Sequence, residues 1–190
     1  MLEKGKKIIY LLWLGVILGL LCVYLANPSI ATPEYFVYFM GQFEYQMMTI
    51  YIVISMLRGF FMIPSTPFVI GGGLLFPDKL GLVLLISMIG IMFSATALYY
   101  FSDLLGFSKY LEKRNPAGIG KWKKRLQHPK ATLLVTAWGF FPLVPTDLIC
   151  YVAGIVKMPF RYMFIGVFAG ELLLDICYVY FGAQLFDFIV

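Results

Sequence analysis

The stretch WGFFPLVPTDLICYVAG, residues 138–154, decides how this chain must fold. It lies within a long apolar run, yet it contains Pro142 and Pro145, and Asp147 follows the second proline by two residues. A straight membrane-spanning helix would not hold these residues so close together, because proline removes a backbone hydrogen bond and clashes with the preceding turn. In lipid, a backbone broken in this way survives only when it is buried in protein or lines a wet cavity. The stretch therefore predicts a broken or re-entrant helix inside a membrane protein.

The composition of the whole chain points to the same environment. The chain has 190 residues, of which 61% are hydrophobic and only 13% are charged. A water-soluble domain usually carries about 25% charged residues. Because so few charges could not cover a soluble surface, we expect an integral membrane protein with one compact membrane domain and no separate soluble domain.

The positive charges are concentrated in two places. Of the 15 Lys and Arg residues, three precede the apolar run 8–26 and eight fall in the segment 107–130. Cationic residues beside membrane segments mark the cytoplasmic side and attract anionic lipid headgroups. We therefore expect the N-terminus and a basic, partly helical loop at 107–130 in the cytoplasm. The net charge of +5 is then a topology signal, and we expect no nucleic-acid partner.

The residues that most often carry catalysis or metal binding are sparse. Cys22, Cys150 and Cys177 are widely spaced in apolar runs, which favours packing roles over a disulfide framework or a zinc site. His128 stands alone in a polar loop, and the sequence has no HExxH, GxSxG or phosphate-binding motif. We expect no cofactor, no metal and no enzymatic activity.

The order of the segments predicts an all-α polytopic membrane protein. Residues 8–26 are long enough for an uncleaved transmembrane anchor. The aromatic residues 35–39 suit a short helix in the membrane interface. We assign residues 1–44 to this anchor and interfacial segment and residues 45–190 to the membrane domain. In that domain, the first repeat is 45–106, with a broken segment at 60–77 and a long span at 80–106. The loop 107–130 follows. The second repeat is 131–190, with a broken segment within 131–156 and a last span at 159–190.

The two repeats share landmarks in the same order. Gly59-Phe60-Phe61 recurs as Gly139-Phe140-Phe141, 80 residues later, and Pro64-x-x-Pro67 recurs as Pro142-x-x-Pro145, 78 residues later. With the loop 107–130 in the cytoplasm, the two copies enter the membrane from opposite sides. The sequence therefore predicts an inverted repeat, a design in which many transporters bring broken helices together near the bilayer midplane.

The candidates for ionisable residues near the bilayer centre are Arg58, Asp103, Asp147, Glu171 and Asp175, with Glu44 as a marginal case. Such a residue costs about 2.5–3.5 kcal/mol at the bilayer centre, so its presence indicates function. Glu171 and Asp175 are four residues apart on one helical face, where two like charges need a positive partner, water or a proton. Asp147 either caps a half-helix or faces a functional cavity. Arg58 either pairs with Asp147 or extends to the interface, and Asp103, near the cytoplasmic end of its span, favours an interfacial position.

The segments RGFFMIPSTPFVIGGGLLFP and FFPLVPTDLICYVAGIVKMPFRYMFIGVFAG resemble the DedA superfamily, in particular the branch called the VTT domain or SNARE-associated Golgi protein family. The resemblance covers roughly residues 45–185. It rests on the two Pro-x-x-Pro segments, each followed by glycine, on Tyr151-x-x-Gly154 and on the long spans. It implies two facing re-entrant segments in an inverted repeat. It also implies a role in flipping or scrambling lipids, including phospholipids and polyprenyl phosphate carriers, with proton coupling in some members.

The chain departs from the family pattern at two positions. Gly139 stands where members often place an arginine, three residues before the first proline of the second segment. Ser102-Asp103 stands where they often carry Gly-Arg. If those arginines hold lipid phosphate in relatives, this chain must use others, and Arg58, Lys157 and Arg161 remain. These departures put a specificity for phosphate carriers in question.

We therefore hypothesise a lipid flippase or scramblase whose partners are membrane lipids. We expect Lys157 and Arg161 to contact headgroups or the interface, and the translocation path to be formed by Arg58, Pro64, Pro67, Gly72, Pro142, Pro145, Asp147, Gly154, Glu171 and Asp175. One rival is a proton- or cation-coupled carrier of a small solute, and another is a scaffold that recruits a partner through its basic loop. Proton coupling and assembly as a homodimer stay open. The short chain and compact loops favour a bacterial plasma membrane over an organelle.

Overall fold

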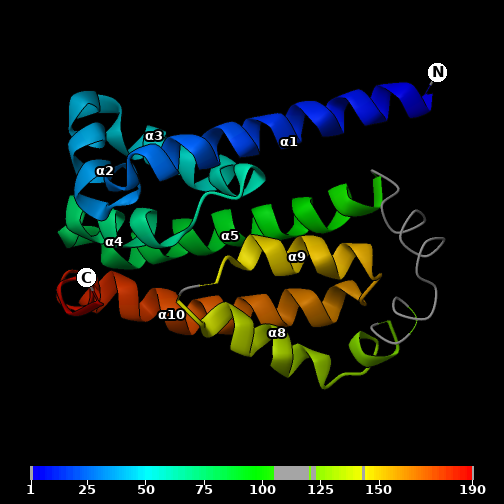
Figure 1. Cartoon of the computed structure of the whole chain (residues 1–190). Helices are drawn as coiled ribbons and strands as arrows, with labels where there is room; N and C mark the ends of the chain where they lie inside the picture. The colour runs from blue at the N-terminus through cyan, green and yellow to red at the C-terminus, as the bar shows by residue number, and fades with distance from the viewer. Residues whose placement is uncertain (1, 105–119, 121–122, 143, 190) are drawn as a thin grey trace. The chain divides into compact units, whose positions relative to one another are not determined.

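In the computed structural model, the described residues are 2–104, 120, 123–142 and 144–189, and the regular structure among them is helical throughout (Figure 1). The predicted cytoplasmic loop lies largely outside the described residues, because positions 105–119, 121 and 122 are not among them. The elements are α1 (Leu2–Ala26), η1 (Pro28–Ala31), α2 (Pro33–Met40), η2 (Gly41–Gln46), α3 (Met47–Leu57), η3 (Arg58–Phe61), α4 (Thr66–Leu75), η4 (Pro77–Lys79), α5 (Leu80–Leu104), α8 (Ala131–Phe140), α9 (Thr146–Ile155) and α10 (Phe160–Ile189).

The first proline segment is broken between η3 and α4. Met62 adopts the left-handed conformation with φ 55° and ψ 30°, and Ile63 N–H donates back to the Arg58 carbonyl at 3.2 Å. This pattern is a Schellman motif, which ends a helix without exposing its last carbonyls. The chain then restarts at α4, where Pro67 lies in the first turn and needs no hydrogen-bond donor.

The second proline segment is broken between α8 and α9. Phe141 is extended, with φ −85° and ψ 114°, as expected for a residue directly before proline. Helix α9 begins at Thr146, immediately after Pro145. The two predicted breaks are therefore confirmed. Helices α4 and α9 contain 10 residues each, so each is about 15 Å long, half the thickness of a bilayer core.

Two helices of the described chain are long and apolar enough to cross a membrane by length and composition. They run over Pro77–Ser102 and Phe160–Gly182. They correspond to α5 and α10 and confirm the two long helices expected at 80–106 and 159–190. Helix α5 begins at Leu80 as expected, and α10 begins at Phe160, one residue later than expected.

The N-terminal part forms the expected helices, with one correction. Helix α1 is tied to the first break by Trp13, whose indole N–H donates to the Phe60 carbonyl at 2.7 Å. The Thr32 hydroxyl caps α2 by accepting from the Tyr35 N–H at 3.2 Å. Phe36 is buried rather than interfacial, because its ring packs on Phe68 of α4 with the centroids 4.8 Å apart.

The chain divides into two compact units, Met1–Ile91 with Asp175–Val190, and Met92–Leu174. In the first unit, α4 lies against the last part of α10: a Cβ added to Gly73 would be 3.1 Å from the Val179 carbonyl oxygen. In the same unit, α3 crosses the first part of α5, where Gly90 meets the Ser55 carbonyl. Glycine at these points lets the helix backbones approach closely.

The second unit uses glycine in the same way. Gly154 of α9 packs directly on the Tyr99 carbonyl and the Ser102 hydroxyl in the last part of α5. Gly170 of α10 packs on α8, where an added Cβ would be 2.5 Å from the Thr136 carbonyl oxygen. Each unit therefore contains one broken helix pair and parts of both long helices.

Candidate functional site

Four charged side chains of the apolar segments are buried inside the protein. The exposed fractions are 5% for Arg58, 8% for Asp147, 1% for Glu171 and 0% for Asp175. Burying a charge costs free energy unless the charge is neutralised or paired. Their concentration at the two helix breaks and on one turn of α10 makes these regions the candidate site.

In the first unit, the buried charges surround Tyr51 of α3. Its side chain is fully buried, and its hydroxyl lies 3.0 Å from the Ser87 hydroxyl of α5. Asp175 and Arg58 are both close enough to act electrostatically on this hydroxyl. Gly72, a predicted site residue, lies directly against it, so that any side chain there would collide with Tyr51. Tyr51 and Ser87 were not among the predicted site residues, since a tyrosine in an apolar run gives no signal that its hydroxyl is buried.

Arg58 braces the first break. Its guanidinium donates from Nη1 to the Ile63 carbonyl at 3.2 Å, across the turn formed by Met62. Since the side chain is buried, the alternative in which Arg58 extends to the interface is wrong. Its pairing with Asp147 stays a prediction.

In the second unit, Asp147 and Glu171 converge on Cys150. Asp147 lies in the first turn of α9, and both carboxylates act electrostatically on the Cys150 thiol, which is fully buried. Pro145, not Asp147, occupies the N-cap position of α9, and Asp147 lies in the first turn. A negative charge in the first turn of a helix is nevertheless favourable, because the N–H groups there are positive.

The predicted prolines and glycines shape the breaks rather than supply chemistry. Pro64, Pro142 and Pro145 are exposed, whereas Pro67 is buried in α4. Gly154 is buried where α9 crosses α5. Side chains next to these backbone positions, not the prolines, would meet a substrate.

The cationic residues expected to contact headgroups are exposed. Lys157 follows α9 in the left-handed conformation, with φ 56°. Arg161 lies in the first turn of α10, where Nη2 donates to the Tyr162 hydroxyl at 3.0 Å and the guanidinium stacks 4.8 Å from the Tyr162 ring centre. Their role in headgroup contact stays a prediction.

The side chain of Asp103 is not among those described, so its expected interfacial position stays a prediction. Gly139 has space for a Cβ, which would be 3.6 Å from the Glu171 nitrogen, an ordinary contact. A clash at the Cβ therefore does not account for glycine at this position.

Two apolar helix pairs, each broken at prolines, together with two long apolar helices and buried charges, define an all-helical class of protein. The VTT domain family model matches residues 63–184, which begin at the first break and end within α10. The chain belongs to this family, that of the DedA and SNARE-associated Golgi proteins, whose members are membrane-associated. No curated protein and no solved structure matches the chain.

Proposed function

We propose that the chain is a polytopic membrane protein that moves lipids, phospholipids or polyprenyl phosphates, between the two leaflets without acting as an enzyme. The exposed apolar faces of the long helices support the membrane part of this proposal. On α5, Leu82, Leu85, Ile89 and Phe93 follow helical spacing and are all exposed. A continuous apolar stripe of this kind suits contact with lipid chains rather than water.

Matching glycine contacts support the inverted repeat. Gly73 meets Val179 in the first unit, and Gly154 meets Tyr99 in the second. Tyr99 and Val179 are 80 positions apart, and the two glycines are 81 apart. Each half-helix thus packs on the long helix of the other repeat at the corresponding residue. That reciprocal pattern is expected of two copies with opposite orientation.

One observation carries the transport proposal: two carboxylates, Glu171 and Asp175, are buried one turn apart on a predominantly apolar helix. A scaffold needs no such charges, and they are expensive in a membrane. A polar headgroup crossing the bilayer needs polar groups along its way, while its acyl tails can stay in the lipid. The buried carboxylates and the half-helix N-termini, with their partial positive charge, can supply such groups.

Reconstitution into liposomes tests the proposal. Purified protein is incorporated with fluorescent phospholipids or a fluorescent polyprenyl phosphate, and transfer between leaflets is compared with that in empty vesicles. We expect rapid transfer by the wild type and its loss in Asp147→Asn and Glu171→Gln, which keep side-chain volume but remove charge. Lys79→Gln, which removes an exposed cation in η4, is the control and should transfer like the wild type.

Absence of transfer for every lipid would overturn the proposal. The same vesicles would then be tested for flux driven by a pH gradient, which the solute-carrier alternative predicts. Thermal unfolding in detergent must show that each variant is folded, because an unfolded variant loses transfer for a trivial reason.

A further inference from the structure

The first break leaves two backbone carbonyls without their usual donors. In a continuous α-helix, each carbonyl accepts a hydrogen bond from the N–H group four residues later. For the carbonyls of Phe60 and Ile63 those residues are Pro64 and Pro67, which have no N–H group. Because an unsatisfied carbonyl is costly in apolar surroundings, both carbonyls need donors from elsewhere in the protein.

Two side chains of the first unit supply these donors. The indole N–H of Trp13 donates to the Phe60 carbonyl at 2.7 Å, and Nη1 of Arg58 donates to the Ile63 carbonyl at 3.2 Å. Arg58 belongs to the break itself, whereas Trp13 lies on α1, 47 residues before Phe60. The hydrogen bonding of the first break is therefore completed by a helix outside the proline segment.

The second break is completed by its own backbone. Pro142 and Pro145 would leave the carbonyls of Trp138 and Phe141 without donors in the same way. Here, however, the Phe141 N–H donates to the Trp138 carbonyl at 3.2 Å, and the Val144 N–H donates to the Phe141 carbonyl at 3.3 Å. The two breaks thus share their proline spacing but differ in the source of the missing donors, and the first break depends on side chains.

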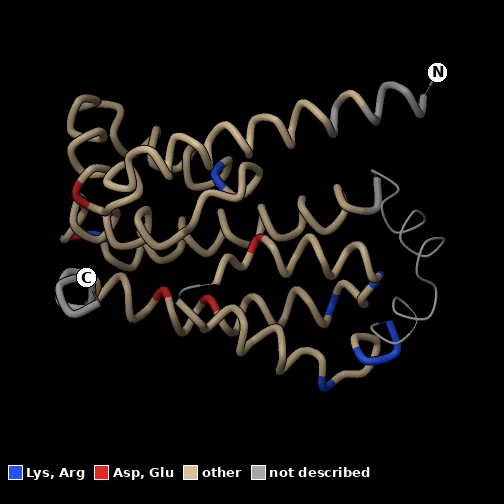
Figure 2. Tube along the Cα trace, viewed as in Figure 1, with Lys and Arg blue, Asp and Glu red and all other residues tan. Residues whose placement is uncertain are grey.

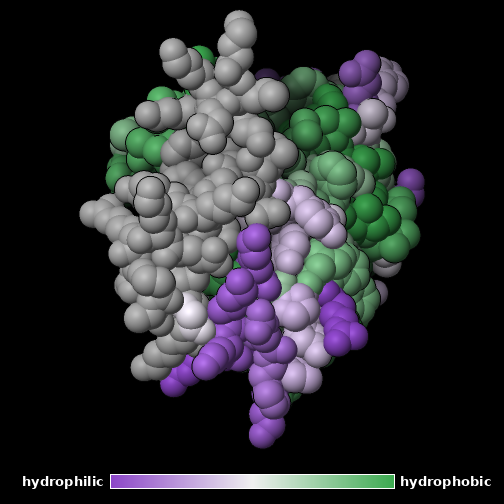
Figure 3. All heavy atoms as spheres, turned by 90° about the vertical axis from the view of Figure 1, so that its right-hand side faces the viewer, coloured by the Kyte–Doolittle hydropathy of each residue, from purple (hydrophilic) through white to green (hydrophobic). Residues whose placement is uncertain are grey.

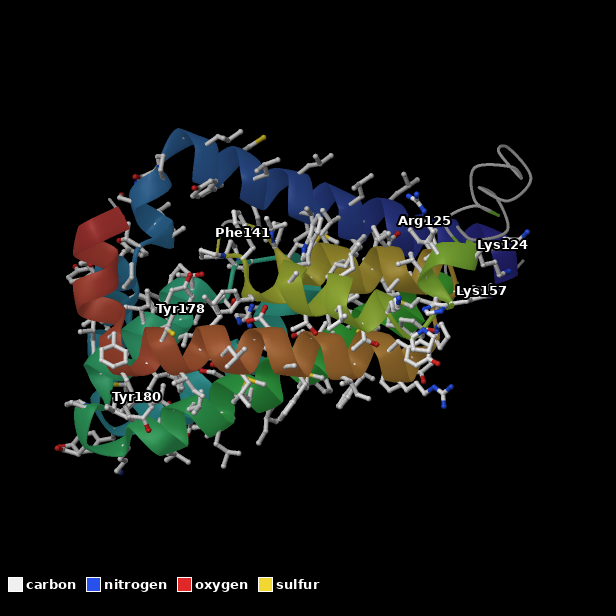
Figure 4. All side chains as sticks on the ribbon, turned by 90° about the horizontal axis from the view of Figure 1, so that it is seen from below. Lys124, Arg125, Phe141, Lys157, Tyr178 and Tyr180 are labelled. Atoms are coloured by element: carbon white, nitrogen blue, oxygen red, sulfur yellow. The ribbon has the colours of Figure 1, made fainter. Side chains whose placement is uncertain are left out.

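The bond from Trp13 lies in an uncharged stretch of α1. Residues 8–26 contain no Asp, Glu, Lys or Arg, and Figure 2 accordingly shows this stretch without red or blue. The exposed cations of the second unit gather at one of its ends instead, where Lys124, Arg125 and Lys157 lie (Figures 3 and 4). In apolar surroundings of low dielectric constant, an N–H···O bond of this kind is stronger than it would be in water.

We propose that Trp13 is a positioning residue of the transport site, through which α1 holds the first break in shape. The break fixes where α4 begins, and α4 places Gly72 directly against Tyr51 in the candidate site. Apolar length alone would be enough for a membrane anchor, but the Pro64-x-x-Pro67 segment also requires the donor that Trp13 provides. The inference rests on the proposed function, although the state of the break can be measured without lipid transfer.

The experiment removes only the indole N–H group, in the full chain. Trp13 is replaced by benzothienylalanine, an isostere of tryptophan in which sulfur stands in place of the N–H group. Hydrogen exchange followed by mass spectrometry then reports on the amides of Met62 and Ile63, which donate to carbonyls of η3. We expect these amides to exchange about tenfold faster, as for the loss of one buried hydrogen bond. Fluorotryptophan at the same position keeps the N–H group and should restore the wild-type rate.

Two matched controls test whether the effect is local. Benzothienylalanine at Trp138 makes the same chemical change at the second break. The Trp138 indole donates to the Pro145 carbonyl at 3.3 Å, but that carbonyl also accepts from the Leu148 N–H at 3.2 Å, so exchange there should be unchanged. Leu12→Ala changes an exposed neighbour of Trp13 on α1 and should leave both breaks unchanged.

Lipid transfer in liposomes then separates a positioning role from a purely structural one. Without the Trp13 N–H group, transfer should be about tenfold slower, because a small displacement of a positioning group lowers the rate even when the change is made far from the substrate. The fluorotryptophan protein and Leu12→Ala should transfer lipid like the wild type.

Three results would overturn the proposal: unchanged exchange at the first break without the indole N–H group, the same increase in Leu12→Ala, or faster exchange with wild-type transfer. The last result would mean that the bond serves stability alone. Failure of the wild type to transfer any lipid would instead overturn the proposed function, while exchange would still decide whether α1 holds the first break.

Discussion

Gly139 and Gly170 show how much a single hydrogen atom in place of a side chain can matter. Both are in helices of the second unit, but their surroundings differ. A Cβ at Gly170 would be 2.5 Å from the Thr136 carbonyl oxygen and 3.0 Å from the Phe140 nitrogen, and neither backbone atom can move cheaply. At Gly139 the nearest atoms would be 3.6 Å away.

We therefore expect Gly170→Ala to destabilise the protein by about 1–3 kcal/mol through overpacking. Gly139→Ala should be neutral or should stabilise by about 0.5–1 kcal/mol, because alanine favours the helix. Thermal unfolding of the two purified variants in the same detergent checks this. Equal destabilisation by both would mean that the α8–α10 crossing is not as close as described.

The Tyr51 hydroxyl gives a second prediction at the residue scale. Tyr51→Phe removes the partner of the Ser87 hydroxyl in a fully buried site. We expect a loss of about 1–3 kcal/mol in the free energy of unfolding, since an unsatisfied buried hydroxyl costs that much. Tyr45→Phe is the control, because Tyr45 is 99% exposed, and it should have no effect. A neutral Tyr51→Phe would indicate that water or another group satisfies Ser87.

The half-helices α4 and α9 depend for their stability on close contact between their backbones and those of the long helices. Each has only 10 residues, and isolated helices of that length are marginal. Packing on a long helix must therefore stabilise them. Gly154 meets a backbone carbonyl of α5, so the contact cannot relax by a side-chain rotation alone.

Gly154→Ala should separate α9 from α5. We expect destabilisation of at least about 3 kcal/mol, at the upper end for overpacking, and faster proteolysis within residues 141–145. The control is Gly81→Ala near the start of α5, where no atom lies within 4 Å of an added Cβ. That variant should be unchanged or slightly more stable. Similar behaviour of the two variants would contradict the α9–α5 contact.

For the whole molecule, the inverted repeat makes a topological prediction. Helix α5 is continuous from Leu80 to Leu104, so the residues before it and after it should lie on opposite sides of the membrane. In a background with Cys22 and Cys177 changed to serine and Cys150 to alanine, Lys79→Cys should react with an impermeant thiol reagent from outside. Lys130→Cys and Lys157→Cys should react only after the membrane is opened. Labelling of all three from one side would contradict the repeat.

The sequence predicted the helices and their breaks because these depend on local and additive properties. Apolar composition predicts helices of membrane-spanning length, and the helices break at Pro64, Pro142 and Pro145, while Pro67 lies in the first turn of α4, where proline is tolerated. The apolar runs around Glu171 and Asp175 likewise made their burial expected, whereas the sequence left Arg58 open between a buried partner and the interface; the structure buries all three.

The partners of those residues were decided only by the tertiary structure. Tyr51 lies beside Ser87 and Gly72, and Phe36 is buried against Phe68, because segments distant in the sequence pack together. Asp147 follows Pro145 at the N-cap because the chain turns at the second break. Helical periodicity cannot supply this, because it fixes which residues share a face and not which face of another helix they meet. The sequence by itself determined that ionisable residues fall in apolar runs beside broken helices, and the packing of those helices decided how deeply each one is buried and which groups surround it.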